Sequence, residues 1–259
     1  MNSRAQHSPR RLRRDSGFTL IEMMIATVIA LFLIGGLLTI LQNEQRTHGN
    51  QAALAQIQDD QRVAMTLLSD GIQTAGYYPS PVEYLVTDVL PSVTEGSTGK
   101  TLAVGQGISG TYSATAPGDK LITRFTAGPL NADVPSPINC NGGTNAAAVE
   151  QPYVNTFSVQ KVGELWQLVC SVNDEDPIPL VSGITRMQIL YGVKKGVSDT
   201  NNSVDTYENA NEVTAANDWQ KISSIKVTLT FDNPLAAAGD PPTTFTRVIS
   251  VMARAGYKT

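Results

Sequence analysis

The stretch that decides the fold is residues 18–41, FTLIEMMIATVIALFLIGGLLTIL. Within it only Glu22 carries a charge. Each helical residue adds about 1.5 Å, so an apolar helix of about 18–25 residues spans the hydrocarbon core of a bilayer. We therefore expect residues 18–41 to form a membrane-spanning helix.

The residues before this stretch are basic, and the rest of the chain is acidic. Residues 1–17 hold five arginines and one aspartate, which gives this segment a charge of +4. The whole chain has a net charge of −4, so residues 18–259 carry −8. Positive flanks stay in the cytoplasm, which places residues 1–17 there and the body on the other side. A secretory signal peptide is the alternative, but its apolar region is usually about 7–15 residues long and ends in an A-x-A-like site. No such site follows here.

Glu22 is the unusual residue of the span. A carboxylate in mid-membrane costs roughly 2.5–3.5 kcal/mol, and less near an edge. Burial becomes tolerable when the carboxylate pairs with an ammonium group. The position therefore predicts a cationic partner, whereas the alternative is a plain membrane anchor with an incidental glutamate.

The helical pattern continues beyond the apolar run. No proline occurs between Pro9 and Pro79, so we expect one helix from residue 18 to about 75, about 85 Å long. Residues 42–78 form its amphipathic continuation. Apolar residues at steps of three or four positions run along this half, interrupted by Gln61: Leu54, Ile57, Ala64, Leu68, Ile72 and Ala75.

Beyond Tyr78 the composition changes to frequent proline, glycine and short alternating runs. Residues 79–259 are therefore expected to form a β-rich globular domain of an α+β protein, an antiparallel sheet packed on the exposed half of the helix. The predicted hairpin turns at Gly163 between strands 156–162 and 164–172. Other predicted elements are strands 119–127, 184–193, 222–231 and 244–253, a short helix within 208–218 and a loop over 129–152.

Two cysteines, Cys140 and Cys170, lie in the part expected outside the cytoplasm. In an oxidising compartment their default state is a disulfide. Both histidines fall within the first 48 residues, which argues against histidine-based catalysis or a multi-His/Cys metal site in the body. We expect no enzymatic activity and no cofactor.

A weak candidate metal loop has oxygen ligands at alternate positions, Asp199, Asn201, Ser203 and Asp205. Val204 stands where such a loop needs glycine, and Ala210 where it needs a bidentate glutamate. A solvated polar loop is therefore the preferred interpretation, with no metal. The acidic body also argues against binding nucleic acid.

The segment Gly17-Phe18-Thr19-Leu20-Ile21-Glu22, after its basic leader, resembles the type IV prepilin motif. The resemblance implies that a prepilin peptidase cuts between Gly17 and Phe18 and methylates the new amine of Phe18. It also implies that Glu22 pairs with the N-terminal amine of a neighbouring subunit during assembly. Residues 1–17 are then a disposable leader peptide, and 18–41 is both membrane anchor and assembly helix.

The body is similar to one branch of that family, the minor pilins of the PilW kind. The similarity is carried by residues 67–78, 118–125, 181–193 and 219–222. The chain departs from the family pattern at Gln73, where an arginine is common, and at Pro79-Ser80, where the family often has Gly-Cys. Major pilins commonly kink the helix with a proline where this chain has Thr39, and its absence favours a minor pilin.

The resemblance implies a type IV pilin-like fold and a minor pilin that joins a priming or tip complex for pilus assembly. Its partners would be prepilin peptidase and, through the N-terminal helices, other minor pilins and the major pilin. It would sit in the bacterial inner membrane with a periplasmic C-terminal domain, and then in the pilus at the cell surface. The alternatives are a minor pseudopilin of a type II secretion system and a pilus-tip adhesin or DNA-uptake module.

Overall fold

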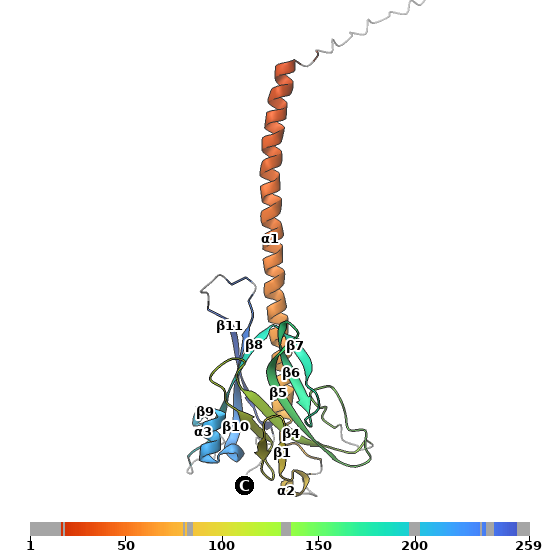
Figure 1. Ribbon diagram of the computed structural model, residues 1–259, viewed down its shortest axis with the longest axis vertical. Coiled ribbons are helices and arrows are strands. Elements are labelled where there is room, and N and C mark those ends of the chain that lie inside the picture. Colours follow the sequence, from red (N-terminus) through yellow and green to blue (C-terminus); the bar gives the residue numbers. More distant parts are fainter. Residues whose placement is uncertain are drawn as a thin grey trace, which may run out of the picture. The chain divides into compact units, whose positions relative to one another are not determined.

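The computed structural model describes residues 17, 19–79, 81, 85–130, 136–196, 203–233, 235–236 and 241–252. It contains a long helix, α1 (Leu20–Gln73), and a β-rich body (Figure 1). The chain divides into two compact units, residues 1–52 and 53–259. The last turns of α1 therefore belong to the same unit as the sheets.

Helix α1 is continuous over 54 residues, or about 81 Å, which confirms the expected single helix. Gly35 and Gly36 remain helical. The helix ends at Gln73, and Gly76 follows with φ 81°. Glycine adopts this left-handed conformation at little steric cost, so Gly76 lets the chain turn sharply away from the helix.

The first large sheet has five antiparallel strands in the order β3-β4-β5-β6-β7. The predicted hairpin around Gly163 is confirmed, with Val162 opposite Leu165. The first strand of that hairpin begins at Gln151, inside the end of the stretch expected to be a loop. The bounds are β3 Ile108–Thr111, β4 Lys120–Ala127, β5 Gln151–Val162, β6 Leu165–Val172 and β7 Ile178–Ser182.

The second large sheet has four antiparallel strands in the order β11-β10-β8-β9. Its three long strands agree with the predicted ones to within three residues at each end. The bounds are β8 Ile184–Val193, β9 Thr206–Glu208, β10 Ile222–Phe231 and β11 Thr243–Ser250. The smaller elements are α2 Val86–Val89, β1 Val93–Glu95, β2 Lys100–Leu102, α3 Ala210–Ala216 and a 3-10 turn, η1 Trp219–Lys221.

Two large sheets enclose the core, which confirms the predicted antiparallel β-rich domain but divides its strands between more than one sheet. They meet where Asp119, just before β4, approaches β8. The Met187 carbonyl accepts a hydrogen bond from the Asp119 N–H at 2.8 Å, and the Asp119 carboxylate accepts one from the Ile189 N–H at 2.7 Å. A parallel bridge also joins Gly118 to Met187. Alternation within each strand cannot show which strands share a sheet, so the sequence left this seam unpredicted.

One face of the C-terminal part of α1 enters the core between the sheets. Ile57, Ala64, Leu68 and Ile72 are buried as predicted, but Leu54 is 47% exposed. The side chain that the prediction missed is Met65, which is buried. The helix also packs closely at Gly71, where an added Cβ atom would lie 2.8 Å from the Phe157 ring.

Arg124 on β4 is a fully buried cation that organises the segment before β3. Its guanidinium donates hydrogen bonds to the backbone carbonyls of Gln106, Ala103 and Pro91, with Nη2 to Gln106 at 2.7 Å and to Ala103 at 3.0 Å. Burial lowers the pKa of Arg124 to about 10. Five donors in a rigid plane suit several carbonyl oxygens at once, so this one side chain holds together the turns on either side of β1 and β2.

Replacing Arg124 with Lys should destabilise the body by about 2 kcal/mol, because one ammonium cannot reach carbonyls spread around a planar fork. The measurement is urea unfolding of the detergent-solubilised chain followed by the fluorescence of Trp166 and Trp219, which both lie in the body. The exposed Arg62→Lys serves as the matched control and should change stability by less than about 0.5 kcal/mol. Equal stability of R124K and the unsubstituted protein would contradict the organising role.

Candidate functional site

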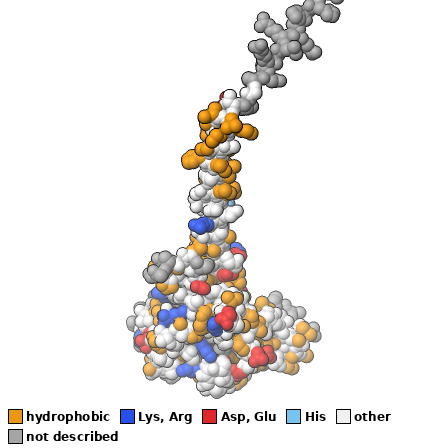
Figure 2. Space-filling view, turned by 45° about the horizontal axis from the view of Figure 1, so that its top comes forward, with side chains coloured by type: hydrophobic (Ala, Val, Ile, Leu, Met, Phe, Trp, Pro, Cys, Tyr) orange, Lys and Arg blue, Asp and Glu red, His pale blue; other side chains and the backbone are white. Residues whose placement is uncertain are grey.

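The N-terminal unit presents a helix whose apolar side chains are uncovered. Fifteen large apolar side chains between Leu20 and Leu41 are 46–81% exposed, and Figure 2 shows them as a hydrophobic band along the helix. Among the described residues, α1 is the one helix long and apolar enough to cross a membrane. A surface of this kind marks a membrane or protein contact.

Glu22 lies at the N-terminal end of this helix and forms a capping box with Thr19. The Thr19 N–H donates to Glu22 Oε2 at 3.0 Å, and the Glu22 N–H donates to Thr19 Oγ1 at 3.4 Å. The Thr19 hydroxyl also donates to Glu22 Oε2, at 2.8 Å. Thr19 is thus the N-cap residue and Glu22 the third helical residue, the spacing that satisfies two otherwise unpaired backbone donors.

The hydroxyl groups inside the apolar run are satisfied within the helix. Thr27 Oγ1 donates to the Met24 carbonyl at 2.9 Å, and Thr39 Oγ1 donates to the Gly35 carbonyl at 3.0 Å. In a bilayer every polar group needs an internal partner. Glu22 is then the one polar side chain of the span that carries a charge. It lies at the end of the helix where the N-terminus favours an anion.

The comparison with protein families gives two matches. The family described as Type IV Pilus-assembly protein W matches residues 151–248, and the Prokaryotic N-terminal methylation motif matches residues 12–38. The first covers β5 to β11 of the body, and the second covers the capping box and most of the apolar helix. No curated protein and no solved structure matches this chain.

These two matches support a PilW-like type IV pilin. Both matched families are structural components of pili, and the pilin motif implies processing by prepilin peptidase and contact with other pilus components. The motif and the uncovered apolar helix together support membrane anchoring. The leader residues 1–16 and the predicted new N-terminus, Phe18, lie outside the residues that the structure describes.

The pilin's two cysteines are joined, which confirms the predicted disulfide. Cys140 and Cys170 form a bond between residues 30 apart in the sequence, with Cα atoms 6.3 Å apart. The Cys140 N–H also donates to Asn155 Oδ1 at 3.3 Å. The disulfide fastens the long β4–β5 connection to β6, the strand that pairs with β5 on its other side.

The candidate metal loop is only partly within the described residues, since Asp199 and Asn201 lie outside them. Asp205 Oδ2 accepts hydrogen bonds from the N–H groups of Lys195 at 2.7 Å and Gly196 at 2.8 Å. The Gly196 and Lys195 bonds hold the pKa of the Asp205 carboxyl below its usual value. This carboxylate therefore closes the base of the loop, and Ser203 also has an interaction. No cluster of three metal-ligating side chains occurs among the described residues.

The capping box is the functional feature that the sequence prediction missed. Its signal was present, because Thr19-x-x-Glu22 before an apolar run is the pattern of a helix N-terminus. The burial cost of Glu22 and the prepilin motif both predict a pairing role for this carboxylate, and neither predicts that it caps the helix. The structure adds that the same carboxylate determines where the helix begins.

Reducing the Cys140–Cys170 bond should destabilise the body by about 3–4 kcal/mol, the loop-closure entropy of a 30-residue loop. Unfolding in urea with and without dithiothreitol measures this difference. A Cys140→Ser/Cys170→Ser protein is the control and should unfold identically with and without the reductant. If the reductant left the stability of the unsubstituted pilin unchanged, the disulfide would contribute nothing to the fold.

Proposed function

We propose that this pilin is a minor subunit that primes or caps type IV pilus assembly. It is made as an inner-membrane prepilin, cut between Gly17 and Phe18, and methylated on Phe18. The single observation that supports this most strongly is Glu22, a carboxylate on an uncovered apolar helix within the methylation motif. A helix without the usual proline at Thr39 favours a minor subunit over the major one.

Orientation in this proposal follows from charge. Five arginines precede the span in residues 1–17, whereas residues 42–52 after it contain Arg46 as the one Lys or Arg. The side richer in positive charge stays in the cytoplasm. The body, with its disulfide, is then periplasmic, where disulfides persist.

The proposed assembly step moves the helix from lipid into a bundle of neighbouring helices. The apolar surface is covered both in lipid and in the bundle, so apolar burial alone does not determine where the subunit is placed. A specific polar interaction is needed to set its register. An ammonium group created by cleavage supplies it, because Glu22 gains a charged hydrogen-bond partner only beside a correctly placed neighbour. Cleavage therefore converts a membrane anchor into a subunit that can be added in register.

Mass spectrometry of the mature pilin from membranes should find an N-methylated Phe18 as the first residue. Cleavage there follows from the motif, and a Gly17→Val protein should keep its leader because the junction no longer fits the peptidase. An unprocessed chain in the unsubstituted strain, or a first residue other than Phe18, would contradict the proposal at its first step.

Substitutions at Glu22 and Thr19 separate charge pairing from helix capping. Gln at position 22 can still accept the Thr19 N–H bond but carries no charge, whereas Thr19→Ala removes the cap and keeps the charge. In a strain lacking the gene, we expect E22Q and E22A to reach the membrane yet restore surface pili at least tenfold less well than the unsubstituted gene. T19A should restore them nearly fully.

The counts of surface pili and the pilin content of sheared pili are the readouts. Full restoration by E22Q would show that Glu22 acts as a cap and not as an ion-pair partner. A gene deletion that leaves pili intact and stops protein secretion would replace the proposal with a pseudopilin of a type II secretion system.

A further inference from the structure

Strand edges are the feature of the body that the proposed function does not explain. An open edge offers unpaired backbone groups to another chain, and proteins usually shorten such edges or place proline in them. Among the described strands, β9 has three residues, β3 has four, and β7 contains Pro179. In contrast, β11 runs eight residues without proline and, within the described part of the chain, pairs with β10 alone.

The register shows which backbone groups of β11 face outward. The Val251 N–H donates to the Ser223 carbonyl at 2.9 Å, and this pair continues the register of Ile249 with Ile225. Because N–H groups alternate in direction along a strand, odd-numbered residues of β11 point toward β10. The groups of Thr244, Thr246, Val248 and Ser250 therefore point to the open edge.

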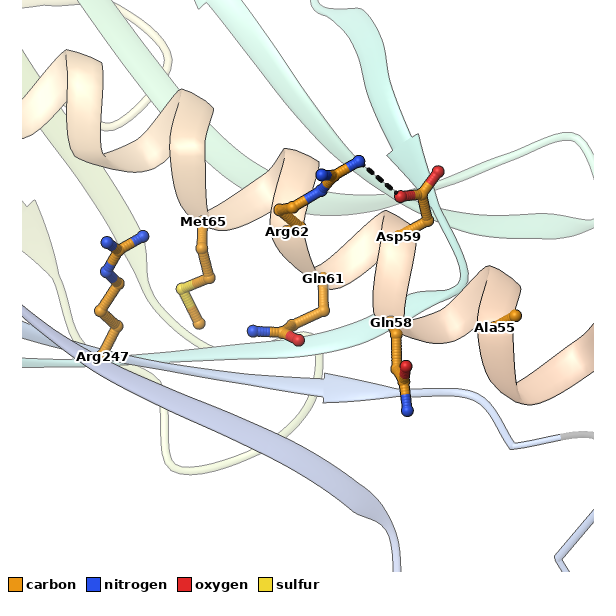
Figure 3. A pocket seen from close by; sticks show the side chains of 7 residues that line it. All are labelled: Ala55, Gln58, Asp59, Gln61, Arg62, Met65 and Arg247. Carbon is orange, nitrogen blue, oxygen red and sulfur yellow. Dashed lines mark hydrogen bonds and ion pairs between the residues drawn. The ribbon is translucent and has the colours of Figure 1, made fainter.

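A groove runs beside this edge. It has a volume of about 500 Å³, and its walls are one stretch of α1 and the Arg247 side chain of β11. Figure 3 shows Gln61, Gln58 and Met65 directed from α1 toward the strands, with Arg247 reaching toward the helix. The other lining residues are Ala55, Asp59 and Arg62. Among the described residues, β11 is the strand that lines the groove.

Arg247 is the charged group of this groove that has no carboxylate partner among the described residues. It lies opposite Val227, a buried residue, so its side chain is on the inner face of the sheet. The carboxylate in the groove, Asp59, is already paired with Arg62 at 2.8 Å. An inward charge on an edge strand discourages indiscriminate pairing, and it leaves pairing open to a strand that brings a carboxylate.

We propose that β11 receives an extended segment of a neighbouring pilus subunit of different sequence as an added strand, with a carboxylate beside Arg247. This rests on the proposed function, because it is a pilus subunit that must dock against others. A second copy of this chain is disfavoured, since antiparallel pairing of two β11 strands would bring two Arg247 side chains toward each other.

The geometry of an antiparallel addition fixes where the carboxylate lies. The outward groups at positions 244, 246, 248 and 250 would form the new hydrogen bonds. The residue opposite Arg247 would then belong to a non-hydrogen-bonded pair, with Cβ atoms about 4.5–5.5 Å apart. Its side chain would enter the groove on the same face as Arg247, within reach of the guanidinium.

The test is photo-crosslinking in piliated cells with benzoyl-phenylalanine at Thr244 of the full chain, followed by mass spectrometry of the partner peptide. The control site is Tyr207 on β9, the opposite edge of the same sheet. We expect a crosslink from position 244 to another pilin and at least tenfold less from position 207. Val248→Pro, which removes an outward N–H, should lower the yield at least tenfold, and Val248→Thr should not.

Arg247→Glu provides a second variant that leaves the backbone unchanged, and it should also lower the yield at least tenfold, whereas Arg247→Lys should stay within about twofold. Resistance to trypsin and an oxidised Cys140–Cys170 pair establish that each variant is folded. Undiminished crosslinking in folded V248P and R247E, or a crosslink to a second copy of this chain through β11, would overturn the inference.

The two proposals can fail separately. If pili form normally without the gene, the priming function fails whatever position 244 contacts. If the gene is needed for pili but V248P and R247E restore them and crosslink as the unsubstituted protein does, only the added strand is wrong.

Discussion

The structure depends on a helix that cannot remain in water. Fifteen large apolar side chains on residues 20–41 are exposed by about half or more. Covering such side chains is worth roughly 1.5–3 kcal/mol each, a total on the order of 20–40 kcal/mol. That exceeds the 5–15 kcal/mol by which a typical domain is stable. This surface must therefore stay in contact with lipid or with other apolar helices. The proposed assembly replaces the lipid contacts with helix contacts.

A single carboxylate, Glu22, is proposed to fix the position of this helix relative to its neighbours. An apolar helix in a bundle can slide or rotate at little cost, because one apolar contact resembles the next. Glu22 breaks this equivalence, since leaving a carboxylate unpaired costs roughly 2.5–3.5 kcal/mol at mid-membrane and less near an edge. Its capping box with Thr19 holds the carboxylate at the helix start, next to where cleavage is proposed to create an amine. The capping contacts use Oε2, which leaves the second oxygen for an amine donor.

The sequence predicted the features that repeat along the chain. Helix α1 followed from hydrophobic spacing and the absence of proline, and β4, β8 and β10 followed from alternation. Features that depend on distant contacts were not predicted. Arg124 resembles an ordinary strand residue until the carbonyls of residues 90–106 surround it, and Asp119 gives no sign that it joins two sheets. Gln61 interrupted the helical pattern without an evident reason, and the structure places it in the groove beside β11.

In the proposed assembly, the surface of residues 20–41 leaves lipid and becomes the contact between subunits. The most direct measurement places a photo-crosslinker at Ile25, on the same apolar helix, and identifies its partner in sheared pili by mass spectrometry. We expect crosslinked peptides from the N-terminal helices of other pilins. A protein that never leaves the membrane fraction, or that enters pili with position 25 linked to no neighbouring helix, would contradict it.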